Sequence, residues 1–477
     1  MIRLSLLYLF VGALSIVAFR DWFIALCGLI LLTVLQQHPD MPSQMFGITG
    51  LNPWNACFLA VICGFFLQRS HQQAAPAPTA PLFRGLLWTY VAMVAVSALI
   101  AVVDASSVKS GRQGSDLRVW LLIDGAVNPL KFLAVGVLVY QGITTRRRAI
   151  IALLVGVGSA LCYSLLMWKS MKLSVLTVDY AGARRVTEKL IGLYANDLGL
   201  TLAFAVWAGA FAALALVRNW QRSAWWIMTA GALPCFLCLK SRAGFLAFAA
   251  AGLALGVVRW RFLLALLPMA GAAAIVLDQS LADRIFTGLG DEFHTDWDEV
   301  SAGRMTNLWP PVIEQITHSP LIGHARYAIL RTACHDEVLL REGVTPNHPH
   351  SAYLEILLDT GVFGLTICVS LMGMIGWGAI RLARRRDDPL MAAIGSAALA
   401  GVVAWLAAGV TGYSFYPSQT SVPYLCVWGV AMRAHWLLQQ RELGAPVAQH
   451  VSVRRVMSIG PKPAMHAAIE RAPEVGP

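Results

Sequence analysis

The sequence predicts an all-α polytopic integral membrane protein with about twelve transmembrane helices and one large loop, containing short helices, outside the cytoplasm. Only 13% of the 477 residues are charged and 57% are hydrophobic, whereas soluble domains carry roughly 25% charged residues. Uncharged apolar runs long enough to cross ~30 Å of hydrocarbon recur along nearly the whole chain. A closed barrel would instead show short strands of alternating hydrophobicity, so the predicted bundle is helical.

Basic clusters between the apolar runs set the predicted topology, because cytoplasmic loops carry an excess of Lys and Arg. The clusters are Arg146-Arg147-Arg148, Arg218 with Arg222, Arg259 with Arg261, and Arg381 with Arg384-Arg385-Arg386. With these four inside, the predicted spans alternate without conflict near 85–103, 119–144, 149–168, 193–217, 224–239, 243–258, 262–280, 353–380, 390–411 and 421–438. The first 68 residues hold two or three further crossings.

The spans divide the chain into four predicted regions. Residues 1–280 carry N-terminal spans with short loops, and residues 353–438 carry the C-terminal spans. Between them, the loop subdomain 281–352 holds five arginines against ten acidic residues, a net charge of −5, which favours internal ion pairs; a helix is predicted over 307–316. The tail 439–477 is rich in Pro, Ala and Arg without apolar periodicity, so we predict a disordered cytoplasmic segment.

Several arginines fall on the outer face and so run against the charge rule. They are Arg184, Arg185, Arg242 and Arg304. A basic residue on the disfavoured side needs a local reason, and a phosphorylated partner supplies one because guanidinium groups match phosphate oxygens bidentately. Snorkelling to the interface or an ion pair with a loop acid is the alternative at each position.

Two imidazoles, His348 and His350, stand at the mouth of the span that begins near residue 353. Histidine accepts and returns a proton at neutral pH without heavy tuning, so this position suggests proton chemistry at the water interface. The i, i+2 spacing across Pro349 predicts extended backbone. The alternative is a histidine that caps or packs the next helix, for which Ser351 is the predicted N-cap.

No metal or cofactor is predicted. Cys334, His335 and Asp336 form no recognised zinc spacing. The acidic run 291–299 matches no EF-hand loop and is interpreted as a solvated surface. The Walker loop of ATP-binding proteins is not evident in the sequence.

Four polar or aromatic residues stay open. Asn196 and Asp197 begin a span, where interhelical hydrogen bonding explains them as easily as substrate contact. Tyr413, in the last outer loop, is placed to stack on a sugar or to sit in an aromatic belt. Lys131 interrupts an apolar run and receives no assignment.

The stretch 348–365, HPHSAYLEILLDTGVFGL, resembles the signature of the O-antigen ligase and polymerase superfamily. Supporting similarities are Ser241-Arg242-Ala-Gly, Gly303-Arg304 with Trp309, and Ser319-Pro320-Leu321-Ile322-Gly323. Together they cover roughly the C-terminal half of the chain. Ser351 stands where Asn is commoner, and Gly323-His324 replaces the usual Gly-x-Gly, so no role is carried over to His324.

The resemblance implies a metal-independent, inverting glycosyltransferase of lipopolysaccharide biosynthesis, working on the periplasmic face of the bacterial inner membrane. It would move a glycan from undecaprenyl diphosphate to lipid A-core as an O-antigen ligase. A polymerase would extend a growing glycan instead, and an oligosaccharyltransferase would modify a protein. The compact loop and the lack of a large extra C-terminal domain disfavour the last branch. Its partners would be that donor, that acceptor and membrane lipids, with no nucleic acid and no cofactor.

In this interpretation His350 is the general base, and Arg242 with Arg184 or Arg185 grips the diphosphate, assisted by Arg304. His348, Tyr413 and Asn196 are secondary candidates. A lipid or polysaccharide transporter fits the composition too. It would place ionisable groups near the midplane of several spans, whereas here polar residues gather at one face.

Overall fold

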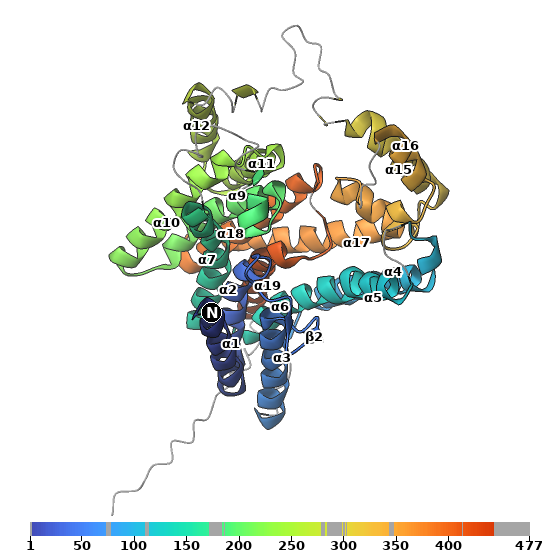
Figure 1. Ribbon diagram of the computed structural model, residues 1–477. Helices are drawn as coiled ribbons and strands as arrows, with labels where there is room; N and C mark the ends of the chain where they lie inside the picture. The colour runs from blue at the N-terminus through green and yellow to red at the C-terminus, as the bar shows by residue number, and fades with distance from the viewer. Residues whose placement is uncertain are drawn as a thin grey trace, which may run out of the picture. The chain divides into compact units, whose positions relative to one another are not determined.

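In the computed structural model, helices make up nearly all of the described elements (Figure 1). The described residues are 2–72, 78–109, 114–170, 184–185, 187–277, 282–283, 298, 301, 303–342, 348–412 and 414–442. The chain divides into a large unit, Met1–Trp436, and a short one, Leu437–Pro477. Strand structure within the described residues is limited to β1 (Gln44–Met45) and β2 (Ile48–Thr49), which pair antiparallel.

The helices follow the apolar runs. The N-terminal half holds α1 (Ile2–Arg20), α2 (Trp22–Leu32), η1 (Thr33–Leu35), α3 (Pro53–Gln72), α4 (Pro81–Val103), η2 (Ala105–Ser107), α5 (Gly114–Leu122), η3 (Ile123–Val127), α6 (Asn128–Gly142), α7 (Arg146–Ser170), η5 (Thr187–Ile191), α9 (Ala195–Ala212) and η6 (Ala213–Ala215). The C-terminal half holds α10 (Asn219–Cys238), α11 (Arg242–Val258), α12 (Leu263–Leu277), η7 (Arg304–Leu308), α15 (Trp309–His318), η8 (Ala328–Leu330), α16 (Cys334–Glu342), α17 (Ala352–Ala383), α18 (Pro389–Gly409), η9 (Gln419–Ser421) and α19 (Val422–Glu442).

Six helical segments in the described part are long and apolar enough to cross a membrane. They are Pro81–Val103, Gly114–Gly142, Arg146–Ser170, Ala195–Ala215, Ala352–Ala383 and Pro389–Gly409. Shorter apolar helices are Leu4–Arg20, Trp22–Leu35, Arg242–Val258 and Leu263–Val276. All of them overlap predicted crossings, so the all-α multi-pass membrane class is confirmed. The count of twelve, the four region boundaries and the side on which the loop 281–352 lies stay predictions.

Small residues let the central helices approach one another closely. The Ala- and Gly-rich α18 packs against α9, α11 and α17. A Cβ added to Gly395 on α18 would lie 2.2 Å from the backbone nitrogen of Ala383 on α17. Close backbone approach of this kind is how membrane helices associate without a hydrophobic driving force. The contact fixes α17, whose N-terminal end carries the site described below.

The glycines of the 348–365 stretch and of the loop before it dock that loop onto α17. The helix bends at Gly361, where φ is +64° and a Cβ would lie 2.3 Å from the backbone carbon of Leu321. A Cβ on Gly323 would lie 2.5 Å from the backbone carbon of Asp359. Across this contact the backbone N–H of Ala325 donates to the Asp359 carbonyl at 2.8 Å. The next residue, Arg326, therefore packs against α17.

The described part of the loop has its own apolar contacts. The helix predicted over 307–316 is confirmed as α15, which packs against α16 and α17. Leu308 and Val312 are buried in one cluster with Leu330 and with Leu358 of α17. The loop is therefore anchored to the membrane helix that it precedes.

Candidate functional site

A cavity of about 630 Å³ opens beside the N-terminal end of α17. Side chains from several helices and from the connection between α18 and α19 meet there. Those with polar groups are Gln36, Gln37, Asn52, Asn55, Asp124, Asn128, Lys131, Asp197, Arg326, His348, Ser351, Glu355, Ser414, Ser418 and Gln419. His348, one of the residues predicted from the sequence, is among them, so this cavity is the candidate site.

The histidine loop is held in an unusual backbone conformation. His350 has a φ of +53°, a left-handed geometry that is uncommon for residues other than glycine and that concentrates at functional sites. The backbone N–H of His350 donates to Nδ1 of His348 at 3.2 Å, and the two ring centroids are 4.2 Å apart. Ser351 then caps α17, accepting from Leu354 N–H, so the predicted N-cap is confirmed.

Trp309 and Arg304 donate hydrogen bonds to the backbone at and beside this loop. Trp309 Nε1 donates to the carbonyl of Pro349 at 3.0 Å. Nη1 of Arg304 donates to the carbonyl of Thr411 at 2.9 Å, and the next residue, Gly412, lines the cavity beside the ring of His350. The Gly303-Arg304 and Trp309 elements of the motif therefore converge with His350 in space.

Both imidazoles are neutral at physiological pH. Burial lowers the pKa of His350 to about 3, and the neighbouring His348 and the positive charge of Arg304 add to that shift. Burial also lowers the pKa of His348, against the opposing influence of Glu355. A neutral imidazole has a free nitrogen that can accept a proton, which is the form that a general base needs.

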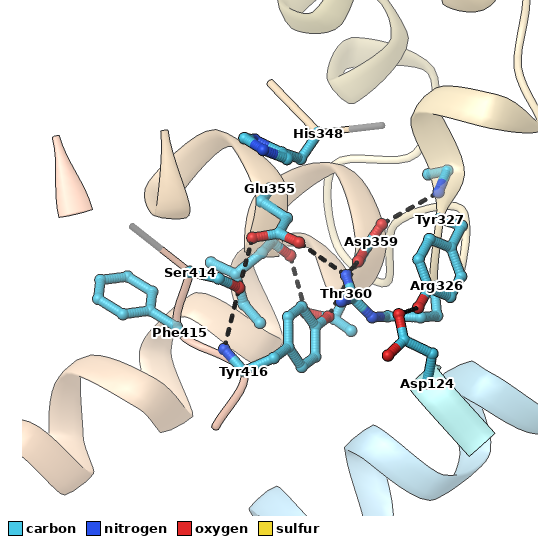
Figure 2. A network of polar contacts seen from close by, with 12 residues as sticks. Asp124, Arg326, Tyr327, His348, Glu355, Asp359, Thr360, Ser414, Phe415 and Tyr416 are labelled. Atoms are coloured by element: carbon cyan, nitrogen blue, oxygen red, sulfur yellow. Dashed lines mark hydrogen bonds and ion pairs between the residues drawn. The ribbon is translucent and has the colours of Figure 1, made fainter. Parts of the chain in front are cut away.

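A buried charge network lies directly under His348 (Figure 2). Nη1 of Arg326 donates to Glu355 Oε1 at 2.7 Å and to Asp359 Oδ2 at 2.9 Å. The guanidinium carbon lies 3.7 Å from the ring centroid of Tyr416, whose hydroxyl donates to Asp359 Oδ2 at 3.1 Å. Ser414 Oγ donates to the second oxygen of Glu355 at 2.6 Å. The network ties the α17 end to the loop that precedes α19.

Sequence reasoning missed this network, although a signal was present. Glu355 and Asp359 stand four residues apart in an apolar run, so both carboxylates lie on one face of a membrane helix. Charged groups at such positions pair with one another or line a polar pathway. Their partner, Arg326, was counted only as one of the loop arginines, because its docking depends on the contact between Gly323 and α17.

A second predicted group assembles at the start of α11. Ser241 caps that helix through Gly244 N–H and also donates to Asn196 Oδ1 at 2.9 Å. A Cβ on Gly244 would lie 3.1 Å from the backbone carbon of Gly199 on α9, so the Ser-Arg-Ala-Gly motif permits a close helix crossing. Arg242 follows the serine that binds Asn196, and Asp197, the residue after Asn196, lines the cavity.

The remaining candidates lie elsewhere or outside the described residues. Arg184 and Arg185 are exposed, and Nε of Arg184 lies 2.9 Å from Glu188 Oε1 in an ion pair. Tyr413 and the tail from 443 onward lie outside the described residues, as does the acidic run 291–299 except Asp298. Among the residues that are described, no group of three or more His, Cys, Asp and Glu is arranged to hold a metal ion.

Comparison with known proteins gives one finding. Residues 227–369 match the family model described as O-antigen ligase. This region includes α11, the loop with Arg304 and Arg326, the histidine loop and the kink of α17. No curated protein matches the chain.

Proposed function

We propose that this multi-pass member of the O-antigen ligase superfamily transfers a glycan from undecaprenyl diphosphate to lipid A-core in lipopolysaccharide biosynthesis. The reaction would take place on the periplasmic face of the inner membrane. The observation that carries the proposal is His350, neutral and held at φ +53° close to Arg304, with its neighbours His348 and Ser351 lining a polar cavity. This arrangement offers a base and a cation at one point, as transfer from a diphosphate requires.

In the proposed reaction the protein supplies one base and two cations. An imidazole nitrogen of His350 takes the proton of an acceptor hydroxyl while the oxygen forms a bond to the anomeric carbon. The bond from that carbon to the phosphate oxygen breaks, and undecaprenyl diphosphate leaves with the electron pair. Arg304 and Arg242 neutralise the charge that develops on the leaving group. Direct displacement inverts the anomeric configuration.

Carrier binding prepares the base. On its own His350 is a weak base, since burial, the neighbouring His348 and the positive charge of Arg304 lower its pKa to about 3. A diphosphate placed against Arg304 brings negative charge to the same point, and a nearby anion favours the imidazolium form. The base therefore strengthens when the donor is bound, which couples proton removal to the presence of an activated glycan.

The pH profile of transfer is expected to show this coupling. The acid limb of kcat/KM reports the free enzyme and that of kcat reports the donor complex. Because His350 has a pKa of about 3 in the free enzyme, kcat/KM should stay flat between about pH 8 and 5, below the ordinary histidine value of ~6.5. The limb of kcat should lie at higher pH. A kcat/KM that falls below pH 6.5 would argue against the neutral, buried base.

Replacing Arg242 with Ala is expected to weaken binding of undecaprenyl diphosphate by roughly ten- to a hundredfold, because a charge-assisted hydrogen bond is lost. Retention of radiolabelled carrier by protein in lipid nanodiscs measures the effect. The matched control is Arg218→Ala, which removes one exposed arginine before α10 and should leave affinity unchanged. Equal affinity of wild type and Arg242→Ala would remove Arg242 from the donor site.

One assay separates the ligase from the polymerase. Purified protein is incubated with undecaprenyl diphosphate glycan and either lipid A-core or unextended glycan, with and without EDTA. Transfer to lipid A-core is the expected result, whereas glycan lengthening alone would identify a polymerase. Activity that disappears with EDTA would contradict the metal-free mechanism.

A further inference from the structure

Lys131 places a positive charge in the cavity, where Asp124 influences it electrostatically without forming an ion pair. It belongs to α6, inside the apolar segment Gly114–Gly142, and is half-buried. Its Nζ donates to Asn55 Oδ1 at 3.2 Å and lies 5.4 Å and 4.9 Å from the ring centroids of Trp54 and Phe132. Among the described residues, no carboxylate lies within 4.0 Å of this ammonium group.

Three acidic groups line the same cavity, and two of them, Asp124 and Glu355, are bound by other partners; the third is Asp197 of α9. Asp124, two turns before Lys131, accepts hydrogen bonds from Tyr327 at 2.7 Å and Asn128 at 3.2 Å. Glu355 is bound by Arg326 and Ser414. Placing an ammonium group in a membrane segment raises the free energy of the protein, and the cation–π contacts with the two aromatic rings offset only part of this increase. An anion that enters the cavity would supply Lys131 with a counter-charge at contact distance.

The rest of the cavity wall suits a sugar. Amide side chains, which donate and accept hydrogen bonds as hydroxyl groups do, line it at Gln36, Asn52 and Gln419. Oε1 of Gln36 is buried with no hydrogen-bond partner among the described residues. The ring of Trp120 adds an aromatic surface. A volume of about 630 Å³ lies in the range of small-ligand sites.

We infer that this cavity binds a sugar bearing an anionic substituent, a phosphate or a carboxylate, with Lys131 as the counter-ion and the amide side chains on the hydroxyl groups. The inference rests on the proposed function for its substrate, since either the incoming acceptor or the donor glycan can carry such a group. It extends that function by assigning the charge selectivity of the glycan site to one residue of α6.

Equilibrium binding to the protein in neutral-lipid nanodiscs tests the inference without turnover. The probes are galactose 6-phosphate, galacturonate, galactose and inorganic phosphate. At least one anionic sugar should bind tenfold or more tightly than galactose, and Lys131→Met should reduce its affinity to the galactose level. A preference for the phosphate or for the carboxylate identifies the substituent. Lys169→Met, an exposed lysine at the end of α7, is the matched control and should change nothing.

Three results would overturn the inference: equal affinity for all three sugars, an unchanged preference in Lys131→Met, or inorganic phosphate binding as tightly as the sugar phosphate. Lys131→Arg, which retains the positive charge, should preserve the preference and guards against a folding defect in Lys131→Met. The measurement is independent of catalysis. Anionic sugars that bind to a protein unable to transfer glycan would therefore refute the proposed function and leave this inference standing.

Discussion

Replacing His350 with Ala is expected to lower glycan transfer by about 10²- to 10⁴-fold, the usual contribution of a general base. The loss should appear in kcat, because the proton is removed only as the acceptor oxygen attacks. Affinity for undecaprenyl diphosphate should stay near that of the wild type, since the arginines hold the carrier. Single-turnover transfer to lipid A-core, measured beside carrier binding in nanodiscs, separates these quantities.

His348→Ala is the informative companion variant. Its Nδ1 accepts the backbone N–H of His350 at 3.2 Å, so we assign it to positioning the loop, and one lost hydrogen bond lowers transfer by about tenfold. The pH profile of this variant should keep the shape of the wild type. Full turnover by His350→Ala, or a larger loss in His348→Ala, would reverse the two assignments.

The helical membrane fold was predictable from the sequence because the hydropathy of each segment alone indicates whether it forms a membrane helix. Runs of about twenty apolar residues predicted the helices, and charged clusters such as Arg146-Arg147-Arg148 predicted where they end. The bend of α17 was not predictable in this way. It depends on Gly361 meeting Leu321, two residues that approach only after the loop has docked.

The site was predictable where a local signal existed. His350 and Arg304 were singled out by position and charge, and the structure brings them together at Gly412 and Thr411. Asn196 accepts a hydrogen bond from Ser241, the residue before Arg242. Arg184 was singled out on charge alone, and its contact with Glu188 matches the ion pair with a neighbouring acid that was its alternative.

The other polar residues of the site could not be interpreted from the sequence, because their partners are distant in the chain. Glu355 lies in the first turn of α17, and its carboxylate is engaged by a loop arginine twenty-nine residues earlier in the chain. Lys131 had no assignment, because the cavity that explains it is built from segments as distant as Asn55 and Gln419. Polar residues inside spans were thus the most informative positions, and each needed its spatial partner to be interpreted.

Replacing Arg326 with Met is expected to destabilise the protein by about 3–5 kcal/mol, the usual cost of removing one partner from a buried ion pair. Arg326 is 9% exposed and Asp359 is 3% exposed, so both carboxylates of the network would be left in low dielectric without a cation. The free energy of unfolding, measured by SDS titration in mixed micelles, checks this. Arg341→Met is the control: its partner Glu337 and Arg341 itself are more than one-third exposed, so its loss should cost at most about 1 kcal/mol.

The triple variant Arg326→Met, Glu355→Gln, Asp359→Asn distinguishes the electrostatic cause from lost packing. Without the two acidic charges, the amide of Glu355→Gln can still accept from Ser414, and that of Asp359→Asn can accept from the backbone N–H of Ala328 while its NH2 group donates to the Tyr416 hydroxyl. A large part of the stability should therefore return. A triple variant as unstable as Arg326→Met would show that the arginine acts by filling space between the tyrosine rings. Recovered stability with unrecovered transfer would show that the paired charges also hold α17 and its histidine loop in the geometry that the reaction needs.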